Sequence, residues 1–419
     1  MPAGTLHTWI TRHIAVRRRL ERICTGYLLF LMVATTKHSL KEAARFSGLH
    51  PSLFSKLLQS HAQVAITTLD HLSKTQARQF AKALPRVHGL PWKIVILLDA
   101  TLQHRASLHP ENTHTFNHGK GYVIGHQWTN VVLVLGDILI PLKPIPFSSK
   151  RYCQTHDLAY HSEQARVVAY LGALDLEAYL GAYDRREVLV LAESGYDDKK
   201  SEKAIAAQGW NFIIALRKTR SVKAQALALR TPKSQQWCHI DTFFRHHRRR
   251  KWDTIRLATR GNTRKRMDLR IRHTSGSLRS VGKVELGCSE RRNRPDGRRT
   301  YLACNDLRAT ARQIVTGYRM RWAVELFHKC VKQNLGFEDV ATHDFDAVMS
   351  HVHWVYCAYI LLHMSPPGLS PGSQSIGDKQ RALQQGLADK EKRQILQKLT
   401  QIGGVPRYKD ELRQALAGT

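Results

Sequence analysis

Apolar residues recur along the chain in two patterns, and the change between them marks a change of structure. Residues 1–88 carry the spacing of helices, and short apolar runs follow at Lys93–Leu98 and Glu187–Ala192. Val131–Leu135 and Ile138–Leu142 flank a Gly-Asp pair, which predicts a β-hairpin. Because later strands alternate with helical segments, the sequence predicts a mixed α/β sheet.

The chain has 419 residues, which is too many for one small core, so we expect several structural regions. Further helices are predicted at Ser162–Leu180, Lys200–Gln208, Leu307–Leu335 and Val348–Met364, and further strands at Phe212–Leu216 and Tyr301–Cys304. The predicted regions are 1–88, helical; 89–216, first part of an α/β core; 217–298, a basic β-rich insertion; 299–364, second part of the core; and 365–419, a linker and a helical tail.

The N-terminal region contains a pattern that is typical of a helix-turn-helix. Ser39 to Glu42 resembles a capping box that opens a helix, Gly48 would form the turn, and Pro51 suits the first turn of the next helix. That second helix would present polar side chains to DNA, with Lys56 among them. A plain helical hairpin is the alternative interpretation.

The charge of the chain favours a polyanionic partner. It has 65 Lys and Arg residues against 33 Asp and Glu residues, a formal net charge of +32, which makes nucleic acid the leading candidate. A structural RNA-binding protein would share this charge. The seven cysteines form no C-x-x-C pair, so we expect neither a zinc site nor a disulfide framework. Scattered cysteines of this kind are typical of a protein in a reduced, intracellular compartment. The apolar run Tyr27–Ala34 is too short to span a membrane, and no signal peptide is evident.

Two tryptophans stand among the basic runs of the predicted insertion. Trp237 and Trp252 could stack on nucleic-acid bases beside the cations, or they could be core residues of a small sheet.

Three acids occupy informative positions. Asp99 and Glu193 each follow a buried strand, and Glu325 lies in the predicted helix Leu307–Leu335. In an α/β sheet, the carboxyl ends of strands are where sites form. Three converging carboxylates can hold two divalent ions about 4 Å apart, and oxygen ligands suit magnesium. For each acid taken alone, a surface charge or a strand-end cap is the simpler interpretation.

Glu325 lies on a stripe with Tyr318, Arg321 and Lys332, which fall on one face if the helix is continuous. A carboxylate between cations can hold a metal while its neighbours bind phosphates, although Arg321 and Glu325 could also form an ordinary surface ion pair. The spacing Tyr-x2-Arg-x3-Glu-x6-Lys resembles the signature of DDE transposases of the insertion-sequence-four family. The segments IVILLDATLQHR and GHQWTNVVLVLGDILIPL are also similar to that family.

The resemblance runs from about residue 89 to about residue 364, and it implies an RNase H-like core interrupted by a β-rich insertion. It implies that Asp99 is the first catalytic aspartate and Glu325 the catalytic glutamate. With Glu193 as the second acid, these residues would be the metal ligands for two Mg²⁺ or Mn²⁺ ions. It further implies that Tyr318, Arg321 and Lys332 hold terminal phosphates of the element, and that an insertion aromatic, with Trp252 the better candidate, stacks on a flipped base.

The second acid departs from the family pattern. The family has aspartate in a D-x-G-Y context, whereas this chain has Glu193 before Ser194-Gly195-Tyr196. Either the site has adapted to glutamate, or Asp197 or Asp198 substitutes, or the protein binds DNA without cutting it.

The sequence therefore predicts a transposase that cuts and joins DNA by two-metal phosphoryl transfer. Its expected partners are the terminal inverted repeats of its element, target DNA, and a second copy of the chain when DNA is bound. The expected location is the cytoplasm of a prokaryote, at the nucleoid. The rival hypotheses are a catalytically impaired DNA-binding derivative and an RNase H-like nuclease.

Overall fold

The computed structural model describes residues 3–35, 37–82, 84, 90–117, 121–224, 237–246, 252–259, 262–292, 299–364, 366–369 and 375–401. It divides the chain into two compact units. The first comprises residues 1–76, 103–125 and 328–419, and the second comprises residues 77–102 and 126–327. The predicted basic runs around 247–251 and the end of the tail lie outside the described residues.

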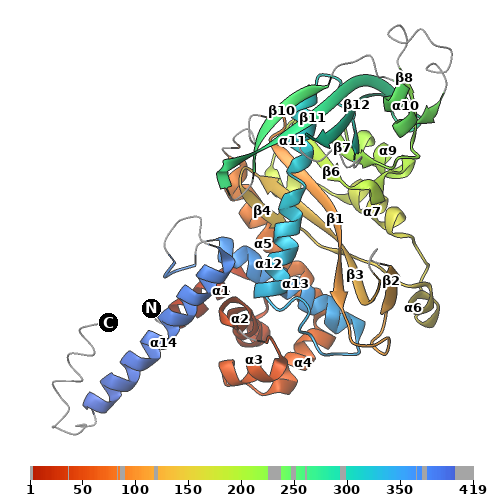
Figure 1. Ribbon diagram of the computed structural model, residues 1–419. Helices are drawn as coiled ribbons and strands as arrows, with labels where there is room; N and C mark the ends of the chain where they lie inside the picture. Colours follow the sequence, from red (N-terminus) through yellow and green to blue (C-terminus); the bar gives the residue numbers. More distant parts are fainter. Residues whose placement is uncertain are drawn as a thin grey trace. The chain divides into compact units, whose positions relative to one another are not determined.

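A mixed β-sheet forms the core of the second unit, with the strand order β3-β1-β6-β7-β13-β12-β11-β8-β9 (Figure 1). β1 pairs with β6 in parallel, β6 pairs with β7 in parallel, and β13 joins β7 antiparallel. The strands are β1 Ile94–His104, β3 Tyr122–Leu135, β6 Val188–Ala192, β7 Asn211–Leu216, β8 Ser221–Ala224, β9 Cys238–His239, β11 Asn262–Leu278, β12 Gly282–Arg291 and β13 Thr300–Cys304. The prediction of a mixed α/β sheet is confirmed.

The edge of the sheet at β3 carries the predicted hairpin. β3 pairs antiparallel with β4 (Ile138–Pro141) around the Gly-Asp turn, where Gly136 has a φ of 61°. β5 (Ile145–Pro146) also pairs with β3. Within the first unit, β2 (His114–Asn117) pairs with the start of β3.

The described part of residues 217–298 contains the strands β8 to β12. β10 (Asp253–Thr259) pairs antiparallel with β11, and β11 pairs with β12. This region does not make a separate sheet, because β12 pairs with β13 and so continues the core sheet. The one described helix within it is α10 (Ile240–His246).

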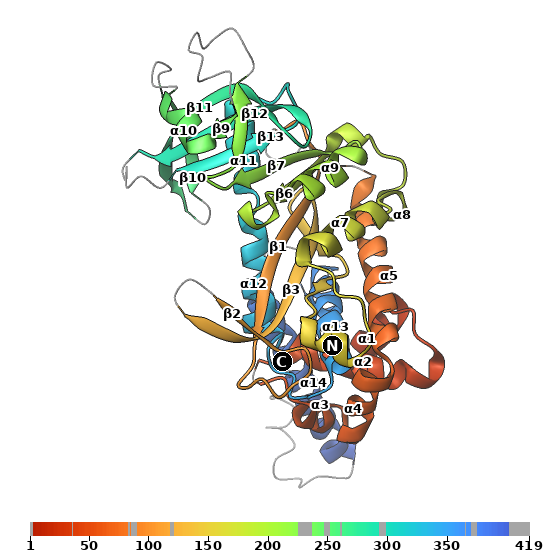
Figure 2. The same ribbon diagram turned by 90° about the vertical axis from the view of Figure 1, so that its right-hand side faces the viewer.

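Helices lie on both faces of this sheet, as Figure 2 shows for β6 and β7. α7 (Glu163–Ala173) and α9 (Lys199–Ala207) pack together on one side, and α11 (Ala311–Arg319) packs on the other. α11 approaches closely at Gly317, where an added Cβ would lie 2.9 Å from the Ile213 side chain. The shorter helices α6 (Lys150–Thr155) and α8 (Glu177–Leu180) complete the described helices between β5 and β6, where a 3₁₀ turn, Arg185–Glu187, leads into β6.

The predicted long helix Leu307–Leu335 is wrong in its extent and continuity. Thr310 caps α11 with a capping box, so the helix begins at Ala311. α11 ends at Arg319, and a second helix, α12, spans Trp322–Asn334. At the break, Met320 N–H bonds to Gly317 O and Arg321 N–H bonds to Tyr318 O, which are the i to i−3 bonds of a tighter turn.

Apart from β2 and the ends of β1 and β3, the described elements of the first unit are helices. α13 (Phe345–His363) is buried along nearly its whole length and packs against α2 (Arg18–Val33) and α4 (Pro51–Ser60). Tyr27 and His351 are joined by a buried hydrogen bond of 2.8 Å. The remaining helices are α1 Ala3–His13, α3 Leu40–Ser47, α5 Ala62–Ala81, whose last turn belongs to the second unit, and α14 Ile376–Gln401.

The cap and turn residues predicted for this segment have the expected local conformations. The Ser39 side chain accepts a hydrogen bond from Glu42 N–H, and Gly48 ends α3 in the left-handed region at a φ of 66°. Pro51 opens α4. DNA contact by α4 stays a prediction.

Candidate active site

Strand register brings the first two acids together. Leu98 of β1 pairs with Ala192 of β6 in a parallel ladder. Asp99 and Glu193 directly follow these two paired residues, so their backbones are neighbours. β6 ends at Ala192, as expected, but β1 continues to His104, so Asp99 does not end its strand. Asp99 is buried, whereas the Glu193 side chain is 45% exposed.

Arg321 lies among all three predicted acids. Its Nη1 is 3.0 Å from Asp99 Oδ1, 3.6 Å from Glu325 Oε1 and 3.9 Å from Glu193 Oε2. Arg321 occupies the break between α11 and α12, while Glu325 lies in the first turns of α12. These side chains therefore do not meet because they share one face of a continuous helix, as the sequence analysis predicted. The turn at Met320–Arg321 directs the guanidinium toward the sheet instead.

Tyr318, on α11, is next to this group. The Arg321 guanidinium carbon lies 6.0 Å from the centre of the Tyr318 ring. Burial raises the pKa of the Tyr318 hydroxyl, and the positive charge of Arg321 opposes that change. The phenol is therefore a neutral hydrogen-bonding group beside the acids at ordinary pH.

The electrostatics of the site favour a bound cation. Burial raises the pKa of Asp99, the charge of Arg321 lowers it and the charges of Glu193 and Glu325 raise it, and together these effects bring it to about 8. One guanidinium therefore does not offset the burial and mutual repulsion of the carboxylates. A divalent cation would supply the missing positive charge, and the oxygen donors fit Mg²⁺ or Mn²⁺.

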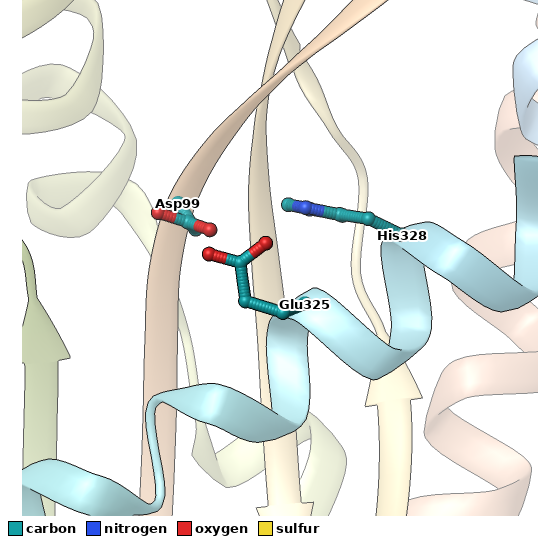
Figure 3. Close-up of side chains that lie close together, drawn as sticks. All are labelled: Asp99, Glu325 and His328. Carbon is teal, nitrogen blue, oxygen red and sulfur yellow. The ribbon is translucent and has the colours of Figure 1, made fainter.

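A group able to hold a metal ion is formed by Asp99, Glu325 and His328 (Figure 3). Each offers a ligand atom, and these atoms lie within 4.8 Å of one another. His328 follows Glu325 by one turn of α12, and the sequence analysis missed it. The sequence did contain one signal for His328, because a residue three positions after the predicted catalytic glutamate lies on the same face of a helix. Glu193 is not in this group, although it lies near the same guanidinium.

The two aspartates considered as substitutes for Glu193 have other partners. Asp197 Oδ2 accepts a 2.8 Å hydrogen bond from Arg217 N–H, and its Oδ1 lies 3.3 Å from Arg220. Asp198 caps α9 and accepts hydrogen bonds from Lys200 N–H and Ser201 N–H. Glu193 therefore remains the candidate for the second acid.

The segment after Glu193 is held by a partly buried hydrogen-bond network. The Tyr196 hydroxyl donates a hydrogen bond of 2.8 Å to Glu163 Oε1. The same carboxylate accepts hydrogen bonds from Thr129 on β3 at 2.9 Å and from Gln127 at 2.8 Å. These contacts tie the turn Ser194–Tyr196 to β3 and to the start of α7, and so restrain the backbone beside Glu193.

The predicted DNA-binding residues Lys332, Lys56 and Trp252 differ in burial and in their charged neighbours. Lys332 Nζ lies 3.2 Å from Glu338. Lys56 is exposed on α4. Trp252 is half-buried, with the guanidinium carbons of Arg270, Arg272 and Arg299 at 5.3, 4.3 and 5.7 Å from its ring centre. Contact with DNA by these residues stays a prediction.

A comparison with known protein families found a match in this chain. Residues 168–361 match the family described as Transposase DDE domain. The matched segment includes Glu193 and Glu325 but begins after Asp99. The match supports a transposase-type function, and DNA is the partner that such a domain implies. The family normally uses divalent metal ions, in keeping with the group at Asp99. A comparison with curated proteins found no match.

A search of the described helices for membrane spans found none of sufficient length and apolar character.

Proposed function

We propose that this protein is a DNA transposase of the insertion-sequence-four type, which cuts and joins the ends of its element by phosphoryl transfer. The observation that carries the proposal is the convergence of Asp99, Glu193 and Glu325 around Arg321. The match to a Transposase DDE domain over residues 168–361 supports it. The net charge of +32 suits the binding of two DNA ends and a target.

In this proposal, Asp99, Glu193 and Glu325 are the catalytic carboxylates, and His328 is an additional candidate ligand. Two Mg²⁺ or Mn²⁺ ions held by such carboxylates supply stabilisation of the negative charge that develops on phosphoryl oxygens. Arg321 orients the carboxylate of Asp99 through their hydrogen bond, which is 3.0 Å long. Tyr318, Arg321 and Lys332 bind phosphates at the end of the element, and Trp252 stacks on an unpaired base.

The substrates in this proposal are the terminal inverted repeats and a target duplex, and two copies of the chain act together when DNA is bound. A second candidate is a DNA-binding derivative that no longer cuts. The position of Glu193 outside the group of close ligand atoms favours this alternative. Glutamate is one methylene longer than aspartate, and a displacement of about 1 Å in a catalytic group can lower the rate about 100-fold.

A strand-cleavage assay tests the proposal. The substrate is duplex DNA carrying the repeats that flank the protein's own locus, with Mg²⁺ or Mn²⁺ present. We expect the natural protein to cut at the repeat ends and Glu325→Ala to lose at least 100-fold in rate while still binding DNA. Glu391→Ala, an exposed acid on α14, is the matched control and should cut normally.

Three results would contradict the proposal in different ways. Cleavage only by Glu193→Asp would support the DNA-binding derivative. Cleavage of branched DNA or RNA hybrids without preference for repeat ends would favour an RNase H-like nuclease. Equal cleavage by the natural protein and Glu325→Ala would place the activity elsewhere.

A further inference from the structure

The second unit contains a basic pocket outside the carboxylate site. Its volume is about 380 Å³, and its cationic lining residues are Lys199, Arg217, Arg220 and Arg279. Asp197 is the acid in its lining, and Thr219 and Ser221 add hydroxyl groups. The lining comes from the start of α9, the end of β7, the start of β8 and the turn between β11 and β12. The core and the insertion therefore build this pocket together.

Two of the arginines are held in place by the fold. Arg220 pairs with the buried acids Asp197, at 3.3 Å, and Glu202, at 2.6 Å. Arg217 donates from Nε to Ser194 O at 3.0 Å, and its backbone N–H donates to Asp197. Such fixed guanidinium groups are preorganised donors for an oxyanion, because little side-chain entropy is lost when the ligand binds.

The other two cations project at the rim. Lys199 and Arg279 are both exposed, and among the described residues neither forms an ion pair with a carboxylate. The Arg279 guanidinium carbon lies 4.8 Å from the centre of the Trp237 ring. The pocket is lined by four cations and one acid, Asp197. Positive charge is in excess even when Glu202, which pairs with Arg220, is included.

The position and the lining of the pocket together favour an anionic ligand with phosphate oxygens. Arg217 bonds to the carbonyl of Ser194, which directly follows the predicted catalytic residue Glu193. An anion in the pocket would therefore lie beside the segment that carries the second acid. Arginine forks match the oxygens of a phosphate, and a lysine adds a point charge.

We propose that this pocket binds a backbone phosphate of the DNA strand that enters the carboxylate site, and thereby fixes the strand's register. This inference rests on the proposed function, because it assigns the pocket to the same DNA substrate. A free phosphate ion offers the same chemistry, so the experiment must separate the two sources.

The test compares Lys199→Ala, Arg279→Ala and the double variant with the natural protein. Arg217 and Arg220 are left unchanged because they contact backbone and buried acids. The matched controls are Lys200→Ala, the next residue of α9, and Arg312→Ala, an exposed arginine on α11. Binding of a labelled duplex carrying the flanking repeats is measured by fluorescence anisotropy without divalent metal, between about 50 and 200 mM salt.

We expect the double variant to bind the duplex about tenfold more weakly at low salt. The magnitude of its slope of log affinity against log salt should fall by up to about 1, since loss of one phosphate contact removes about 0.9. Both controls should stay within about twofold of the natural protein. The melting temperatures should agree, because the substituted side chains are exposed.

Equal affinity and equal slope in the double variant and the natural protein would overturn the proposal. So would calorimetric binding of inorganic phosphate that the double variant loses while its DNA affinity is unchanged, because the pocket would then serve a free anion. Since binding is measured without metal, a protein that does not cut DNA still tests the pocket. The cleavage assay with Glu325→Ala tests the proposed function separately.

Discussion

Arg321 and Asp99 form a hydrogen-bonded ion pair of 3.0 Å although 222 residues separate them in the chain. The carboxylate comes from the central part of β1, and the guanidinium comes from the turn between α11 and α12. This pair joins two distant segments at the place where Glu193 and Glu325 also lie within 4 Å of the same Arg321 nitrogen.

Replacing Arg321 with glutamine should shift the pH dependence of cleavage. The pKa of Asp99 is about 8 with Arg321 in place, and Arg321 lowers it, so loss of the guanidinium should raise this pKa further. Asp99 is then ionised only at higher pH, and the acidic limb of the rate profile should move upward. Arg321→Lys should restore part of the shift. Rate profiles between pH 6 and 10, with Arg312→Gln as the control, check this prediction, and an unmoved limb in Arg321→Gln would contradict it.

Divalent ions should stabilise the natural protein against heat. A ligand that binds only the folded state at about 100 times its Kd adds about 2.7 kcal/mol to the free energy of unfolding. We expect Mn²⁺ to raise the melting temperature of the natural protein, but not that of an Asp99→Asn, Glu325→Gln double variant. His328→Ala should reduce the shift if its imidazole is a ligand. A chelator should reverse the shift, and equal shifts in all variants would exclude metal binding by these residues.

Glu202 should make stability fall as the pH rises. Its carboxyl is fully buried, and burial raises its pKa from 4.5 to about 7 despite its pair with Arg220. The folded state therefore binds the proton more tightly than the unfolded state. This contribution is present below pH 4.5 and is lost as the pH rises through about 7.

Glu202→Gln should remove this slope, so that the variant gains about 1 kcal/mol per pH unit over the natural protein across that range. Unfolding by denaturant at several pH values measures the difference. Glu391→Gln, an exposed acid on α14, should give a curve parallel to that of the natural protein. A parallel curve for Glu202→Gln would show that its proton affinity is the same in both states.

Gly336→Ala should destabilise the protein strongly. Gly336 has a φ of +67°, and an added Cβ would lie 2.4 Å from Cβ and Cγ of His38. The strain of the left-handed conformation and the overlap together should cost about 2–4 kcal/mol. Gly386→Ala is the control, because Gly386 lies within α14 with nothing within 4 Å of an added Cβ. The control should be neutral or slightly stabilising, and similar melting temperatures for the two variants would contradict the assignment of strain to Gly336.

Much of the sheet was predictable because its strands have strong local signals. The apolar runs before Asp99 and Glu193 are buried on both faces, so they read as strands without knowledge of their partners. Their parallel pairing could be inferred from the alternation of strands and helices. The continuation of β1 to His104 could not be predicted, because that part of the strand is more polar and more exposed.

The break between α11 and α12 could not be read from residue types. No proline interrupts Leu307–Leu335, and Gly317 lies before the break rather than in it. The interruption depends on packing: α11 contacts β7 and β12, and Arg321 pairs with acids that are remote in sequence. His328 was missed for a related reason, since a histidine on a helix gains meaning as a ligand only once Asp99 is known to lie near it.

The turn at Met320–Arg321 also limits which length changes this segment can accept. A residue inserted there would rotate α12 by about 100° about its own axis relative to α11. Glu325 would then swing away from Asp99, even though every helical residue kept its own neighbours along the helix. The number of residues between Tyr318 and Glu325 should therefore be under tighter constraint than the identity of most residues between them.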